Sequence, residues 1–358
     1  GYHAYLAGNA LAGFVPPVIG LRNGILFTQW LDDAGGKQTD AKRQAIVRAI
    51  PSYVARRVHC LQLAEDPCSE SPDHDWTGST VMINLLFRNV YGRFTGLLKL
   101  PALRRQLRRY DTPCPTLIDG QMGPNEWVAT NAGIYKVDFE HLNFGGAALN
   151  VVDPAYDLAA AIFEFRLSES EEAEVMLAYE QESTDLTVRN RILLYKLLYG
   201  RLAMNRAKEK SATEHLTEAG RSWNLQRLFA RKFLICQMAR FCASLSETLS
   251  ASAWTGDLFF MDLDGVLDAD HIGFPHTTMN GLNAVHLLQS HGYSIVVSTA
   301  RSVEQVRHYC EIYGFPGGLA EHGSVFVDRV GQREVPLIDE EAADQLDKCR
   351  EALANMPG

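Results

Sequence analysis

Two aspartates, Asp262 and Asp264, follow directly after the apolar run Leu258–Met261, which predicts a β-strand. Because ligands bind outside the carboxyl ends of the strands in open α/β sheets, both carboxylates are expected to lie in that crevice. Gly265 lets the chain turn away sharply behind them. Paired carboxylates can ligate Mg²⁺, and one of them can attack phosphorus to form an aspartyl-phosphate while the other protonates the leaving oxygen. The spacing therefore predicts Mg²⁺-dependent phosphoryl chemistry.

A second predicted strand, residues 293–298, ends in the run Ser298-Thr299-Ala300-Arg301. The hydroxyl group of Thr299, at the tip of this strand, could hold a phosphoryl oxygen by a hydrogen bond. The peptide N–H groups that open the following helix also favour anions. The two strand ends together predict a site for a phosphorylated ligand.

These strand ends resemble the haloacid dehalogenase (HAD) superfamily of phosphatases over residues 257 to about 330. The resemblance implies that Asp262 is the nucleophile, that Asp264 is the acid/base and that Thr299 is the second-motif hydroxyl. It implies Mg²⁺ as the metal, with Asp262 and Asp264 as ligands. It also implies substrate contacts from three residues: Gly265, Ser298 and Arg301.

The run of residues 318–326 resembles the large-cap subgroup of that superfamily, which includes sucrose-phosphate and trehalose-phosphate phosphatases. This resemblance implies a sugar phosphate or another small phosphorylated metabolite as the substrate. The subgroup has a further Lys and an acidic pair after its cap, but residues 329–358 contain a single Lys, Lys348, inside a charged helical pattern. We therefore expect the HAD-like domain to be truncated within its cap.

A second set of polar residues lies earlier in the chain. Asp119 lies six residues before Asn125, and Asp138 lies thirteen residues after it. Phosphoryl transfer to a hydroxyl group needs an acceptor for the hydroxyl proton and oxygen ligands for the Mg²⁺ on the nucleotide. A loop acid, a nearby amide and an acid that ends the next hairpin supply these groups. Asp157 follows in the run Asp-Pro-Ala-Tyr-Asp-Leu-Ala, residues 153–159.

This order resembles the C-lobe of aminoglycoside phosphotransferases and choline-kinase-like enzymes, most strongly over residues 116–163. The resemblance implies ATP as a cofactor, Asn125 and Asp138 as metal ligands, and Asp157 as the residue that braces the catalytic loop. It predicts a kinase-like fold over residues 1–250.

Two alignments of the catalytic loop remain open. A one-residue shift makes Asp119 the base, whereas the ungapped match places Gln121 on the base and Glu126 on the amide. Since Gln cannot accept a proton as a base, the second alignment predicts a divergent or inactive kinase. A Gly-rich loop and a phosphate-binding Lys are absent from the start of the chain, in which the first Lys is Lys37. We expect this domain to lack most of its N-lobe.

Helices must position most of these groups in the first part of the chain. Residues 39–66, 82–110 and 156–250 have helical periodicity. Short apolar runs at 115–140 predict a loop and a small hairpin, and Asn23-Gly24 predicts an earlier hairpin because Asn-Gly readily adopts positive φ.

The pattern changes after Trp254 to strand–helix–strand–helix, which is typical of a parallel sheet. The predicted fold class is thus an α/β, HAD-like Rossmannoid sheet at residues 253–358, behind a mainly helical, protein-kinase-like C-lobe at residues 1–250.

Composition excludes several classes of protein. The net charge of the 358 residues is −9, which gives no general reason to expect a nucleic-acid partner. No apolar run reaches the roughly 20 residues of a membrane span. The seven Cys are scattered without a CxxC pair, which argues against zinc or disulfides and for a reducing, cytoplasmic location. The oligomeric state is left open.

The main hypothesis from the sequence is a Mg²⁺-dependent HAD-type phosphatase fused to a kinase-like phosphotransferase, and so a bifunctional protein. The first alternative is a small-molecule kinase that transfers phosphoryl from ATP to a hydroxyl group, with an accessory HAD domain. The second alternative is a regulator that binds a phosphorylated ligand without turnover.

Overall fold

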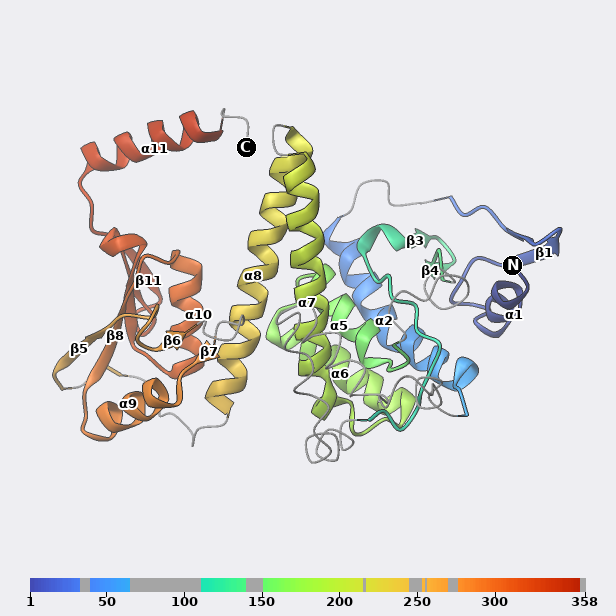
Figure 1. The fold of residues 1–358 in the computed structure, drawn as a ribbon, viewed down its shortest axis with the longest axis horizontal. Helices are drawn as coiled ribbons and strands as arrows, with labels where there is room; N and C mark the ends of the chain where they lie inside the picture. Colours follow the sequence, from blue (N-terminus) through green and yellow to red (C-terminus); the bar gives the residue numbers. More distant parts are fainter. Residues whose placement is uncertain are drawn as a thin grey trace. The chain divides into compact units, whose positions relative to one another are not determined.

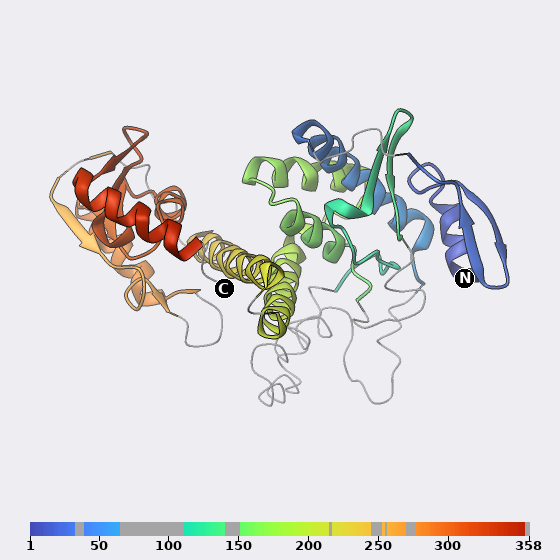
Figure 2. The same ribbon diagram turned by 90° about the horizontal axis from the view of Figure 1, so that it is seen from above.

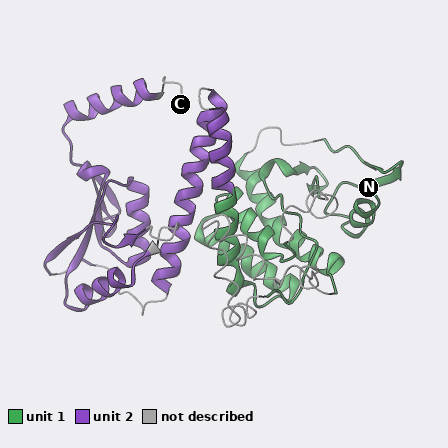
Figure 3. Ribbon diagram, viewed as in Figure 1, with its two compact units in different colours: residues 1–202 green, residues 203–358 purple. Residues whose placement is uncertain are grey.

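The computed structural model describes residues 1–32, 39–64, 111–139, 151–214, 217–244, 253–254, 256–269 and 276–354. These residues form two compact units, residues 1–202 and 203–358, which are coloured separately in Figure 3. The domain boundary near residue 250 stays a prediction from the sequence. The helix predicted at 82–110 lies outside the described residues.

The first unit begins with a helix and the predicted hairpin. Helix α1 (Tyr2–Ala10) precedes strands β1 (Val18–Arg22) and β2 (Ile25–Thr28), which pair antiparallel. Asn23 and Gly24 at the turn have φ values of +53° and +79°, so the turn chemistry expected from the sequence is confirmed.

Helices make up most of the first unit (Figures 1 and 2). Their bounds are α2 (Asp40–Leu61), α5 (Ala155–Glu164), α6 (Glu169–Ser183) and α7 (Val188–Thr213), the last of which continues into the second unit. Helix α2 packs against α5 and α6. Every residue of α5 from Ala155 to Phe163 is buried, so this helix forms the centre of the unit.

A short hairpin supplies the strands nearest the predicted kinase residues. The 3₁₀ turn η4 (Pro124–Glu126) leads into β3 (Trp127–Thr130), which pairs antiparallel with β4 (Gly133–Lys136). The loop and small hairpin predicted at 115–140 are therefore present among the described residues of that range.

The second unit contains a five-stranded mixed sheet with helices. Its elements are listed in chain order: α8 (Glu218–Ser244), β5 (Leu258–Met261), β6 (Asp268–Ala269), β7 (His276–Thr277), α9 (Met279–Ser290), β8 (Ser294–Ser298), α10 (Val303–Tyr313), β9 (Gly317–Ala320), η5 (Glu321–Gly323), β10 (Val325–Asp328), β11 (Arg333–Pro336) and α11 (Glu340–Ala354). The strand order in the main sheet is β11-β10-β9-β8-β5, and β6 pairs with β7 separately. Apolar side chains of β5, β8, α8, α9 and α10 form its core.

The sequence predicts a parallel sheet, and only part of the observed sheet is parallel. β5 pairs parallel with β8, and β8 with β9, through the helices α9 and α10 that connect them. β10 and β11 are antiparallel to their neighbours. The short turn η5 joins β9 to β10, and a parallel pairing needs a crossover of a dozen or more residues. The fold is thus helix-rich with a mixed sheet. The predicted parallel pairing is present from β5 to β9, and the antiparallel pairs of β10 and β11 depart from the prediction.

No helix among the described residues is both long enough and apolar enough to cross a membrane.

Candidate functional site

The carboxylate of Asp157, on α5, binds the backbone of the predicted kinase loop. Asp157 Oδ2 accepts the backbone N–H of Asp119 at 2.8 Å, and Oδ1 accepts that of Gly120 at 2.7 Å. Gly120 has φ of +80°, which favours glycine at this bend. Asp157 is 1% exposed, so no solvent competes for these bonds. The sequence prediction that Asp157 braces this loop is confirmed.

The carboxylate of Asp119 is enclosed by donors of the protein. Tyr53 Oη donates to Oδ2 at 2.5 Å, and the N–H of Gln121 donates to Oδ1 at 3.1 Å. Lys136 Nζ lies 3.4 Å from Oδ1 and Arg57 Nη1 lies 3.5 Å from Oδ2. The side chain is fully buried. Asp119 therefore contacts four protein groups, and its role as the base stays a prediction.

Burial also sets the protonation of this cluster. Burial raises the pKa of Asp157 to about 6, and the nearby negative charge of Asp119 adds to the rise. Burial raises the pKa of Tyr53 well above its usual value, so its hydroxyl stays protonated and donates to Asp119. The loop is thus anchored by groups whose charge states depend on one another.

The hairpin brings the two predicted metal ligands to one end of a short sheet. The N–H of Val137 donates to the carbonyl of Glu126 at 2.9 Å, which ties the residue before Asp138 to the residue after Asn125. Both Asn125 and Asp138 are exposed. Asp138 has a left-handed backbone conformation, with φ of +51°, so the chain leaves the direction of the hairpin at this residue.

The chemistry of this donor set suits Mg²⁺ on a nucleotide. Mg²⁺ takes one or two carboxylates and keeps several waters and phosphate oxygens as its other ligands. Asp138 offers an exposed carboxylate and Asn125 an exposed amide. Among the described residues, no group of three or more His, Cys, Asp or Glu side chains is placed to hold a metal ion by itself. Together these two exposed side chains could give two oxygen ligands to a divalent cation.

In the second unit, the predicted strand ends do lie side by side. Met261 pairs with Val297, so Asp262 and Ser298 follow adjacent ends of β5 and β8. Asp262 is exposed, and its Oδ1 accepts the N–H of Leu263 at 2.7 Å. Thr299 is 5% exposed, and its hydroxyl accepts the N–H of Arg301 at 3.3 Å.

Arg301 engages the acid that we expected to be the acid/base. Its Nε and Nη2 donate to the two carboxylate oxygens of Asp264 at 3.0 and 2.6 Å, and Nη2 also donates to Asp268 at 3.1 Å. Tyr309 donates to Asp268 as well. Gly265, with φ of +84°, turns the chain between these acids as expected. Arg301 is therefore a partner of Asp264, and its expected contact with a substrate stays a prediction.

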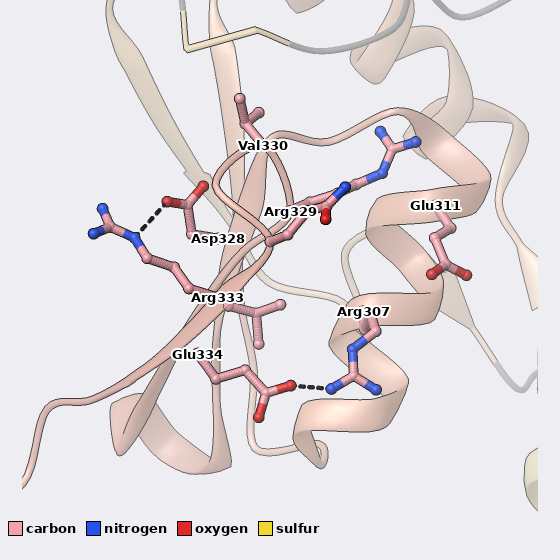
Figure 4. Close-up of a pocket in the computed structure, with 9 residues that line it drawn as sticks. Arg307, Glu311, Asp328, Arg329, Val330, Arg333 and Glu334 are labelled. Carbon is pink, nitrogen blue, oxygen red and sulfur yellow. Dashed lines mark hydrogen bonds and ion pairs between the residues drawn. The ribbon is translucent and has the colours of Figure 1, made fainter.

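A pocket of about 800 Å³ lies elsewhere in the second unit, between α10 and the β10–β11 hairpin (Figure 4). Its charged lining includes Arg307, paired with Glu334, and Arg333, whose Nε lies 3.0 Å from Asp328 Oδ2. None of the predicted site residues lines it. This pocket is therefore separate from the residues that the sequence predicts as the site of this unit.

Sequence reasoning missed three residues of the first unit: Tyr53, Arg57 and Lys136. Arg57 and Lys136 are 1% and 0% exposed although both are charged. Tyr53 and Arg57 lie four residues apart on α2 among Ile50, Val54 and Val58, all of which are buried. A cation on the apolar face of a helix was the available signal, because buried charges are paired.

Comparisons with known proteins give a likeness in fold only. No protein-family model matches the chain, and no curated protein matches it in sequence. A choline/ethanolamine kinase family protein from Mesorhizobium loti matches in structure with a TM-score of 0.41 and 15% identity, over 64% of this chain and 77% of that one. Choline kinase LicA from Streptococcus pneumoniae gives 0.41 and 14%, over 64% and 78%. An ethanolamine kinase from Plasmodium vivax gives 0.40 and 13%, over 63% and 70%.

One expectation is corrected by this result. We expected the enzyme to be, first, a HAD-type phosphatase, but these structural matches are kinases and not HAD hydrolases. The prediction that the enzyme is a HAD-type phosphatase is therefore wrong, and the kinase-like alternative remains as a proposal.

Proposed function

We propose that the first unit is a kinase-like domain that binds ATP with Mg²⁺ and transfers the γ-phosphoryl group to a hydroxyl group of a small molecule. The observation that carries the proposal is the brace between Asp157 and the amides of Asp119 and Gly120. It fixes a loop that leads through η4 into the hairpin that ends in Asp138. The bond from Val137 to Glu126 extends the pairing of that hairpin to the residues next to Asp138 and Asn125.

Each group has a defined part in this reaction. Asn125 and Asp138 would hold the Mg²⁺ that accompanies the nucleotide, and the metal would neutralise charge on the phosphates. The bond between the terminal phosphorus and the bridging oxygen breaks, the bond to the substrate oxygen forms, and ADP leaves. The hydroxyl proton passes to an acceptor, for which Asp119 is the proposed group. Because phosphoryl transfer depends mainly on positioning and electrostatics, a weak or slow base still permits turnover.

A second candidate is a nucleotide-binding regulator without turnover. The enclosure of Asp119 favours it, because a carboxylate that four protein groups surround is poorly placed to accept a substrate proton. Gln121, the other residue aligned with the base, cannot accept one. The two candidates share nucleotide binding and differ only in turnover.

The test uses the full chain. Binding of Mg²⁺-ATP is measured by calorimetry, and ADP release is measured with a panel of alcohols that includes choline, ethanolamine and an aminoglycoside. Kinase function predicts alcohol-dependent ADP release that Asp138→Ala abolishes and that Asp119→Asn lowers at least ~100-fold if Asp119 is the base. Glu174→Gln, at an exposed acid of α6, is the matched control and should be silent.

The outcomes separate the candidates. Binding that depends on Asp138 without any ADP release supports the regulator. Absence of nucleotide binding by the wild-type chain would refute both.

A further inference from the structure

Arg57 reaches from α2 to both segments that carry the proposed site. Its Nε donates to the carbonyl of Leu117 at 2.9 Å, just before the braced loop. Its Nη1 donates to the carbonyl of Phe139 at 2.9 Å, directly after Asp138, and to Tyr53 Oη at 2.8 Å. One side chain therefore bonds to the backbone on each side of the site.

The planar guanidinium fixes the geometry between its acceptors. Its N–H groups lie in a rigid fork, so the positions of the Leu117 and Phe139 carbonyls are set relative to each other. A lysine, with a compact ammonium at the end of a flexible stem, cannot hold both carbonyls in the same arrangement. Tyr53 extends the contact to Asp119, because the same hydroxyl that accepts from Arg57 donates to that carboxylate.

Lys136 adds a shorter tie between the same segments. Its Nζ donates to the carbonyl of Val137 at 2.6 Å and lies 3.4 Å from Asp119 Oδ1. Arg57 and Lys136 thus place two buried cations against the two buried acids Asp119 and Asp157. Removing Arg57 leaves an uncompensated negative charge in the interior, which costs stability and displaces the remaining groups.

Arg57 does not touch a ligand in this arrangement. Its side chain is 1% exposed, and its bonds go to protein atoms. Any influence on nucleotide binding must therefore pass through its protein partners, which are the carbonyls of Leu117 and Phe139 and the hydroxyl of Tyr53.

We infer that Arg57 is a positioning residue that holds Asp138 in register with the Asp157-braced loop, so that the affinity for Mg²⁺-nucleotide depends on the guanidinium. This inference rests on the proposed function, since it concerns the same site. It goes further by naming the side chain, on a helix distant in sequence, that sets the separation of the two segments.

The test compares Arg57→Lys with Arg56→Lys in the full chain. Arg56 is the adjacent residue of α2 and is exposed, and within the described part of the chain its side chain donates to the carbonyl of Ala10, which makes it a matched control. Arg57→Lys keeps the positive charge and is the variant that best preserves folding. Circular dichroism and thermal unfolding of each variant check that the fold is retained.

Three readouts separate positioning from loss of structure. In Arg57→Lys, the Mg²⁺ concentration for half-maximal ATP binding should rise ~10- to 100-fold, because a displacement of about 1 Å can cost that much. If turnover occurs, KM for the alcohol should stay within about twofold, whereas a general loss of structure would change both. Hydrogen exchange at Gly120 and Val137 should accelerate together, because both amides lie in the two segments that Arg57 joins.

The outcomes are distinguishable from failure of the proposed function. If the wild-type chain binds no nucleotide, the proposed function fails, and the inference is judged by exchange alone: joint acceleration at Gly120 and Val137 supports the structural coupling. Wild-type exchange at both amides in a folded Arg57→Lys variant overturns it. Wild-type Mg²⁺ dependence in that variant overturns the inference while leaving the proposed function standing.

Discussion

Replacing Asp157 by Asn removes half of the brace beneath the loop. The wild-type carboxylate gives one oxygen to the N–H of Asp119 and the other to that of Gly120. Asparagine has nearly the same shape, but its amide nitrogen must face one of the two N–H groups. One buried donor is then left without an acceptor, while the other bond persists.

The expected magnitude follows from that single lost bond. Leaving a buried N–H unsatisfied costs about 1–3 kcal/mol, which corresponds to a roughly 5- to 150-fold change in the local opening equilibrium. Asp157→Ala removes both acceptors and should cost about twice as much. Because both hydrogen bonds go to the amides of Asp119 and Gly120, the effect should stay local to the residues near them.

Hydrogen-exchange mass spectrometry of the peptide spanning residues 115–123 measures this effect. One protected amide should exchange faster in Asp157→Asn and two in Asp157→Ala, and Glu174→Gln should match the wild type. Unchanged exchange in the alanine variant, with the fold intact, would show that the carboxylate does not hold the loop.

The same variant has a pH signature. The folded pKa of Asp157 is raised from 3.8 to about 6, so between those values the folded chain binds a proton that the unfolded chain has released. Stability therefore falls as pH rises from about 4 to 6 and levels off above that range. Asp157→Asn should lose this slope in urea unfolding, and an unaltered slope would assign the titration to another group.

Three further predictions concern stability. His308→Gln should flatten the rise in stability between pH 4 and 6.5, because burial lowers the folded pKa of His308 from 6.5 to about 4 and the unfolded chain binds the proton first; urea midpoints across that range check it. Arg191 lies 2.7 Å from Asp153 and 2.6 Å from Asp185, all buried, so Arg191→Met should cost about 3–5 kcal/mol, and a loss under ~1 kcal/mol would contradict the buried triad. Ser168→Ala breaks the capping box of α6 and should cost ~1 kcal/mol in the unfolding free energy, with a Ser168→Thr variant expected to retain most of it.

Local signals predicted part of this structure well. The Asn23-Gly24 turn and the hairpin before Asp138 each follow from residues whose types favour one backbone geometry, whereas the brace by Asp157 follows from the resemblance to the kinase motif. The parallel pairing of β5 with β8 also follows from the strand–helix–strand order. Such features are encoded within short stretches of chain or in a motif with fixed roles.

The rest depends on partners far apart in the sequence. Arg57 bonds to Leu117 and Phe139, which are 60 and 82 residues away. Periodicity shows that Arg57 lies on the buried face of α2, but it does not say which carbonyls receive its N–H groups. The enclosure of Asp119 is hidden for the same reason, because Tyr53 and Lys136 approach it from separate elements.

The antiparallel β10 shows a different limit. The direction of β10 depends on the turn between it and β9. Residues 321–323 leave no length for a crossover, so connection length carried the answer that strand pattern alone did not.

The burial of every residue from Ala155 to Phe163 makes α5 a rigid element inside the first unit. Alanines stand at positions 155 and 159–161 of this helix, and their small side chains let neighbouring helices approach closely. At the far end of the helix, the hydroxyl of Tyr199 donates a hydrogen bond to Glu164. Close-packed interiors pass strain along instead of absorbing it. A larger side chain at Ala160 would therefore shift Asp157 and the loop above it, so a substitution that contacts no ligand could tune ligand affinity. Variation in this helix is expected to act as remote adjustment of the site.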